Sequence, residues 1–111
     1  MRKALVHVKG VPAAVLSEHA PSGTPAAYRM EYLPDYAAGA APRPVSLLLP
    51  VQAEPHVSDF LFPVFDNMLP EGAFRRSICR ALHVDEADRF GLLLALAQHD
   101  SIGDITLTRL D

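Results

Sequence analysis

The segment FLFPVFDNMLPEG, from Phe60 to Gly72, gathers bulky apolar side chains around a single Asp–Asn pair and ends in Pro-Glu-Gly. Pro63 suits the first turn of a short helix, where its missing N–H is not needed, and Pro70 is expected to end that helix. Three interpretations are open for this segment: a loop of catalytic carboxylates, a structural turn, or a surface that another protein binds.

Two further helices are expected after this segment. Residues 73–84 place apolar side chains at i, i+4, i+7 and i+8, which is the spacing of one helix face. These apolar residues are Phe74, Ile78, Ala81 and Leu82, and Arg75, Arg76 and Arg80 lie largely on the solvent side. Asp85 is the expected N-cap of a third helix, RFGLLLALAQ (89–98), and Asp88 completes its start. Because that helix is apolar on most faces, we expect it to be central and buried.

Strands are expected on both sides of the helices, because several segments alternate apolar and polar side chains. In one of them, Tyr28, Met30 and Tyr32 share a face. Residues 34–44 are rich in proline and alanine and predict a loop. The pattern predicts one domain over residues 1–111 with an α+β fold, a small antiparallel sheet with about three helices packed on one face. The expected strands are 3–8, 11–18, 27–33, 45–51 and 102–110.

Composition limits the classes of function. The chain has 111 residues, 50% of them hydrophobic, and a formal net charge of −3. These values suit a globular domain and argue against a basic nucleic-acid-binding surface. Cys79 is the only cysteine, so an intrachain disulfide is excluded. The opening MRKALVHVKG alternates, unlike a signal peptide, and no apolar run approaches the roughly 18 residues of a membrane span. We expect a soluble cytoplasmic protein that contacts neither nucleic acid nor membrane directly.

Catalytic and metal-binding patterns are weak. The five histidines lack the spacing of a zinc site, and the six glycines are too well separated to form a phosphate-binding loop. Asp59, Asp66 and Glu71 could form a carboxylate pair, but acids near helix starts are more often caps or dipole partners. Two nucleophile–base pairs are conceivable, Ser17 with His19 and Cys79 with His83, yet neither has an evident third, orienting group. We therefore predict no metal, no cofactor and no enzymatic activity.

Three motifs and their order carry a more specific signal, since the chain resembles the N-terminal subdomain of HipA-type toxin kinases along nearly its whole length. That subdomain typically carries Phe-Phe-Asp-Asn-Leu-Leu-Pro-Glu-Gly, then a helix, then an FGLL…G…IGAV ending. The opening hairpin and SLLLP (46–50) also match in order. The corresponding residues here are Phe65-Asp66-Asn67-Met68-Leu69-Pro70-Glu71-Gly72, then Phe90-Gly91-Leu92-Leu93-Leu94, then Ile102-Gly103-Asp104-Ile105.

HipA kinases carry their ATP site and catalytic loop downstream, and this chain reaches Asp111 without them. We therefore expect a stand-alone form of the subdomain, similar to the HipS proteins of three-gene HipBST toxin–antitoxin systems. The resemblance implies an antitoxin that docks on a HipT-like serine/threonine kinase toxin and obstructs its active site. It also implies a HipB-like DNA-binding protein as a possible member of a ternary complex.

The same resemblance implies which residues contact the kinase. An aromatic residue commonly follows Pro-Glu-Gly directly in this family, whereas here Ala73 does so and Phe74 comes one position later. It is therefore open which side chain enters the kinase site. The expected partner-binding residues are Phe65, Asn67, Met68, Leu69, Pro70, Glu71, Ala73 and Phe74.

A purely structural interpretation competes at each of these positions. Phe60, Phe62 and Phe65 are expected to be core residues, and Met68 and Leu69 could simply fill the space between helices. Asn67 either fastens the turn through backbone groups or acts as a cap. Two other functions also remain open: a non-inhibitory structural or activating subunit of a HipA-like kinase, and a free-standing binding module.

Overall fold

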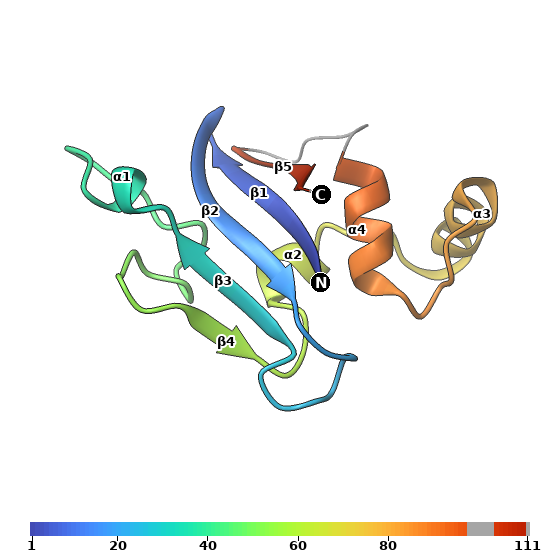
Figure 1. Ribbon diagram of the computed structural model, residues 1–111. Helices are drawn as coiled ribbons and strands as arrows, with labels where there is room; N and C mark the ends of the chain where they lie inside the picture. Colours follow the sequence, from blue (N-terminus) through green and yellow to red (C-terminus); the bar gives the residue numbers. More distant parts are fainter. Residues whose placement is uncertain (98–103, 111) are drawn as a thin grey trace.

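The computed structural model describes residues 1–97 and 104–110. Five antiparallel strands form one sheet in the order β4-β3-β2-β1-β5, so β4 and β5 are its edges (Figure 1). The α+β fold with an antiparallel sheet is therefore as predicted from the sequence. The strands are β1 (Arg2–Val8), β2 (Val11–Glu18), β3 (Tyr28–Tyr32), β4 (His56–Ser58) and β5 (Ile105–Leu110).

The β1–β2 hairpin forms where the alternating pattern predicted it. Its two turn residues, Lys9 and Gly10, both have positive φ angles, 52° and 80°. Tight two-residue turns of this kind follow the right-handed twist of the strands, and glycine adopts such angles without a steric penalty. The turn fixes the register in which Val8 faces Val11, and a bulge between Val6 and His7 then shifts the pairing by one residue, so that Ala4 faces Leu16.

One face of the sheet is buried. Residues opposite one another in an antiparallel pair point to the same face, and the register puts Ala4, Leu16 and Met30 in one row across β1, β2 and β3. All three are fully buried, as are Tyr28 and Val6 nearby. The face predicted for Tyr28, Met30 and Tyr32 is thus the core face.

The described part of the chain contains four helices besides the sheet: α1 (Pro34–Ala37), α2 (Pro63–Asp66), α3 (Gly72–Leu82) and α4 (Arg89–Ala97). Helix α4 lies against the sheet and supplies the buried side chains of Phe90, Leu92, Leu93 and Leu94. Helix α3 lies on the far side of α4 from the sheet (Figure 1). The prediction of a central, buried third helix is confirmed, but α3 is a peripheral element.

Three local expectations were wrong. Residues 45–51 form no strand; they form a tight turn closed by the Ser46–Leu49 bridge. The strand that follows them and forms an edge of the sheet is β4. The segment 34–44, which was predicted to be a loop, begins with helix α1. Phe60 was expected in the core, but it is 64% exposed. Its ring lies against Gly23 and not among the buried side chains of the sheet.

The N-cap of α4 also differs from the prediction. The helix begins at Arg89, so Asp88 is the capping residue, and its Oδ1 accepts the backbone N–H of Gly91 at 3.1 Å. Asp85 instead accepts the N–H of Ala87 at 2.8 Å and closes the turn that precedes the helix. Gln98 of the expected helix, and Ile102 and Gly103 of the expected strand and third motif, lie outside the described residues. No helix within the described ranges is long and apolar enough to cross a membrane.

Candidate partner-binding surface

Buried side chains attach the turn between α2 and α3 to the core. Phe62 and Phe65 meet edge to face with ring centroids 6.3 Å apart, and both are buried. Leu69 is also buried, at the far end of the same turn. Phe65 and Leu69 therefore hold the segment in place and present no surface to a partner in this conformation, although the sequence assigned both to the partner-binding set.

Two features fix the path of the turn into α3. The Arg75 side chain folds back, and its Nε donates a hydrogen bond to the Pro70 carbonyl at 2.7 Å. Gly72, the first residue of α3, has a φ of 59°, an angle that residues with a side chain rarely adopt. Together with the fixed φ of Pro70, these features limit the conformations that the turn can adopt. They also give a physical reason for the Pro-Glu-Gly motif.

The exposed part of the segment is its outer rim. Asn67, Glu71, Ala73 and Phe74 are exposed, and Met68 and Pro70 are half-buried. The Asn67 side chain makes no hydrogen bond to any described residue; its backbone N–H bonds to the Pro63 carbonyl at 2.9 Å. Glu71 occupies the N-cap position of α3 without a capping hydrogen bond from its side chain. Both side chains are therefore available to a partner.

Helix α3 is amphipathic, but its apolar side is only partly covered, because Ile78 packs against the core and Phe74 does not. Cys79 is its only buried residue among those described. Phe74 is 67% exposed, Ile78 is half-buried and Leu82 is exposed. At about 3.6 residues per turn, these three positions follow one another along one side of the helix. We call Phe74, Ile78 and Leu82 the apolar ridge of α3, which the sequence had led us to expect against the core.

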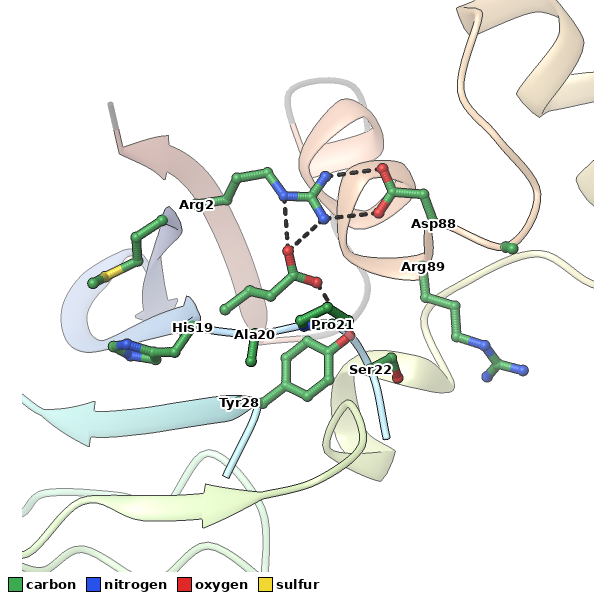
Figure 2. A pocket seen from close by; sticks show the side chains of 11 residues that line it. Arg2, His19, Ala20, Pro21, Ser22, Tyr28, Asp88 and Arg89 are labelled. Atoms are coloured by element: carbon green, nitrogen blue, oxygen red, sulfur yellow. Dashed lines mark hydrogen bonds and ion pairs between the residues drawn. The ribbon is translucent and has the colours of Figure 1, made fainter. Parts of the chain in front are cut away.

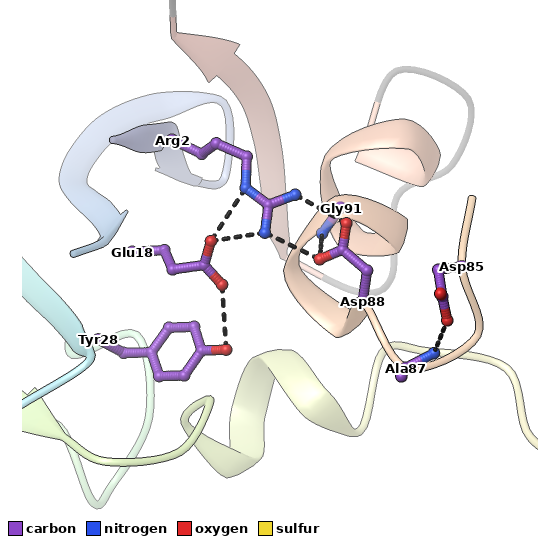
Figure 3. A network of polar contacts seen from close by, with 7 residues as sticks. All are labelled: Arg2, Glu18, Tyr28, Asp85, Ala87, Asp88 and Gly91. Atoms are coloured by element: carbon purple, nitrogen blue, oxygen red, sulfur yellow. Dashed lines mark hydrogen bonds and ion pairs between the residues drawn. The ribbon is translucent and has the colours of Figure 1, made fainter. Parts of the chain in front are cut away.

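A polar junction joins β1 and β2 to the start of α4 (Figure 3). The Arg2 guanidinium donates to both oxygens of Asp88, at 2.9 and 2.8 Å, and to Glu18 Oε1 at 3.0 and 2.5 Å. The Tyr28 hydroxyl donates to the other oxygen of Glu18 at 3.2 Å. Hydrogen bonding from Arg2 lowers the pKa of Asp88, and burial raises the pKa of Tyr28. These residues were not expected as a cluster, because Arg2 and Asp88 are far apart in the sequence.

The pocket beside this junction, with a volume of about 490 Å³, is lined by its charged side chains (Figure 2). Arg2, Glu18 and Asp88 are already paired with one another, and Arg89 pairs with Asp66 at 2.6 Å. A charged ligand would have to break these pairs to bind. The geometry therefore indicates a structural connection between helix and sheet.

The carboxylates considered as catalytic candidates have separate structural partners. Asp59 Oδ1 accepts the Ala26 N–H at 2.8 Å, and Asp66 forms the ion pair with Arg89. Ser17 Oγ lies 2.8 Å from His19 Nε2, so this predicted pair does meet, but the serine is only 6% exposed. Within residues 1–97 and 104–110, no group of three His, Cys, Asp or Glu side chains is placed to hold a metal ion.

Comparison with known proteins identifies the family. A model of the HipA N-terminal domain matches residues 4–108 of this chain. The N-terminal domain of HipA toxin, a solved structure, superposes with a TM-score of 0.68 at 28% identity, covering 100% of this chain and 94% of that chain. An uncharacterized protein of Haemophilus influenzae is 36% identical over 67 residues, which is 60% of this chain and 59% of that protein's length.

These matches agree with the resemblance found in the sequence and with the α+β fold. They give the protein a HipA-related toxin–antitoxin context, and the domain that they match is the N-terminal one of HipA. The chain belongs to the HipA N-terminal domain family.

Proposed function

We propose that this protein is an antitoxin that binds a HipT-like serine/threonine kinase and obstructs its active site. The contact is made by the α2–α3 turn and the apolar ridge of α3. The observation that carries the proposal is Phe74, a large aromatic side chain that is 67% exposed at the start of a helix whose apolar side is only partly covered.

The partial exposure of α3 and the pre-organisation of the turn before it both favour binding to a partner. An amphipathic helix normally places its apolar side against the core, and laying that side in a partner's groove is a common mode of protein recognition. Aromatic side chains dominate the energy of such contacts. Because Pro70, Gly72 and the Arg75–Pro70 hydrogen bond already fix the turn, little conformational entropy is lost on binding.

Burial divides the eight implied residues into two groups. Phe65 and Leu69 support the surface from the core, while the contact itself is assigned to the exposed and half-buried members. Between Ala73 and Phe74, the proposal favours Phe74, since its ring offers far more area to a partner than a methyl group. The surface members are Asn67, Met68, Pro70, Glu71, Ala73 and Phe74.

The proposal is tested by co-purification and a phosphorylation assay with a HipT-like kinase from the same organism. We expect a stable complex with suppressed kinase activity, and Phe74→Asp should abolish both while the melting temperature stays within a few degrees of the wild type. Phe60→Asp is the matched control, because Phe60 is similarly exposed but precedes α2. A complex with full or increased activity would replace the antitoxin with a structural or activating subunit.

A further inference from the structure

Arg76 and Arg80 lie one helical turn apart on α3, and both are exposed. Neither forms a hydrogen bond or ion pair with a described residue. Other arginines of the chain are used internally: Arg2, Arg29 and Arg89 pair with carboxylates, and Arg75 bonds to the Pro70 carbonyl. We call Arg76 and Arg80 the cationic ridge of α3.

The cationic ridge is unfavourable for the isolated helix. Two like charges at i and i+4 destabilise a helix by a few tenths of a kcal/mol, and an acid three or four positions away would offset this. The positions three or four residues from Arg76 and Arg80 contain no Asp or Glu; they hold Gly72, Ala73, Ser77, Cys79, His83 and Val84. Helix α3 thus carries three arginines and no acid in a chain of net charge −3. This local excess of positive charge has no counterpart within the helix.

Helical geometry puts the two ridges on opposite flanks of the outward face. At about 3.6 residues per turn, Arg76 and Arg80 lie on one flank and Phe74 and Ile78 on the other. The short side chains of Ala73, Ser77 and Ala81 lie between them. Cys79, the buried residue, points in the opposite direction toward the rest of the protein. A partner that accepts this face needs one apolar wall and one wall that is negatively charged.

We propose that the cationic ridge binds the acidic side of the kinase's active-site cleft, next to the apolar wall that receives Phe74. This inference deepens the proposed function and rests on it. Protein kinases hold their magnesium ions through an Asp carboxylate and an Asn side chain, and the Asp of the catalytic loop is part of the same site, so a cleft without Mg²⁺·ATP presents carboxylates that no metal compensates. Guanidinium groups bind carboxylates with paired hydrogen bonds, which matches the chemistry of the ridge. Helix α3, with these two ridges, should therefore bind a cleft that has an acidic wall in preference to a purely apolar groove.

The test measures association and dissociation rates with the same HipT-like kinase by stopped-flow fluorescence, from about 50 to about 300 mM NaCl. The wild-type association rate should fall steeply as salt rises. Arg76→Glu and Arg80→Gln should each slow association at low salt, by about fivefold and about twofold, and the differences should shrink at high salt. Arg80 is changed only to glutamine because an acid in the last helical turn would weaken the helix itself.

Arg43→Glu and Arg43→Gln are the matched controls, because Arg43 is exposed and lies outside α3. Each control changes the total charge of the protein by the same amount as the corresponding α3 variant. If the α3 variants bind at the same rate as the Arg43 variants, or if wild-type association is independent of salt, the cationic ridge has no role and the antitoxin proposal stands without it. If wild-type protein forms no complex at any salt concentration, both proposals fail. Circular dichroism of each variant checks that α3 is still helical.

Discussion

The carboxylate of Asp88 meets the guanidinium of Arg2 with both of its oxygens, at 2.9 and 2.8 Å, across 86 positions of sequence. The same carboxylate caps α4 through the Gly91 N–H, and the guanidinium lies 5.4 Å above the centre of the Phe90 ring. A helix cap, an ion pair and a cation–π contact therefore meet at one point. This point joins the first strand to the helix that separates α3 from the sheet.

Gly91→Ala should destabilise the protein, although alanine is the better helix former by about 1 kcal/mol. A Cβ at position 91 would lie 2.2 Å from Asp88 Oδ2 and 2.9 Å from an Arg2 nitrogen, so the carboxylate would have to move away from both of its partners. We expect a net loss of about 1–2 kcal/mol in the free energy of unfolding, measured by urea denaturation.

The control for this prediction is the same substitution in an Asp88→Ala background. With the Asp88 carboxylate removed, the remaining close neighbour of the new Cβ is the end of the Arg2 side chain, which has lost one of its two carboxylate partners and can shift, so Gly91→Ala should stabilise the helix by its intrinsic propensity. An equal effect of the substitution in both backgrounds would show that Asp88 does not require glycine at position 91.

Asp88→Asn should remove a contribution to stability that depends on pH. Because hydrogen bonding from Arg2 lowers the pKa of Asp88 in the folded state, this contribution is complete above the unfolded pKa of about 4 and is lost as pH falls through the folded value. Both groups are more than a third exposed, so the difference from wild type at pH 7 should be only about 1 kcal/mol. Thermal melts at pH 7, 5 and 3 should show it shrinking toward low pH; a constant difference would mean that the ion pair is not its source.

The β1–β2 hairpin and α4 could be predicted because their signals are local. Strict alternation around Lys9-Gly10 and a long apolar run are both read from neighbouring residues. The region 45–51 is different: Val45 and Leu49 are buried, but around the hydroxyl group of Tyr32 and not as part of a strand. An apolar run alone does not distinguish a strand from a turn that is held by a distant side chain.

The candidate surface was only partly predictable for a related reason. Helical periodicity showed that Phe74, Ile78 and Leu82 share one side of α3, but it contains no information about what covers that side. Phe62 and Phe65 are buried, as the sequence analysis expected, but nothing in the local sequence indicates that Phe74 is exposed. The three motifs, in contrast, were sufficient to identify the family, because their order along the chain does not depend on packing.

Tyr32→Phe should be more damaging than Tyr36→Phe. The buried Tyr32 hydroxyl accepts the Val45 N–H at 2.8 Å and donates to the Leu49 carbonyl, so its loss leaves two buried backbone groups unpaired, at a cost of about 1–3 kcal/mol. The Tyr36 hydroxyl bonds to the N–H and carbonyl of Arg43 in the same way, but at an exposed site where water can replace it. Urea denaturation of both variants measures the costs, and faster hydrogen exchange at Val45 should accompany Tyr32→Phe. Equal costs would contradict the role of burial.

Arg75→Gln should weaken binding of the kinase by loosening the α2–α3 turn and not by removing charge. The variant loses the Nε hydrogen bond to the Pro70 carbonyl, so the turn must be ordered on binding, and we expect the dissociation constant to rise about fivefold. Arg76→Gln makes the same change in charge without affecting that hydrogen bond. At about 300 mM NaCl the deficit of Arg76→Gln should largely disappear, because exposed charges are screened, whereas that of Arg75→Gln should persist. If both deficits disappear together, Arg75 contributes only its charge, and pre-organisation of the turn is not part of recognition.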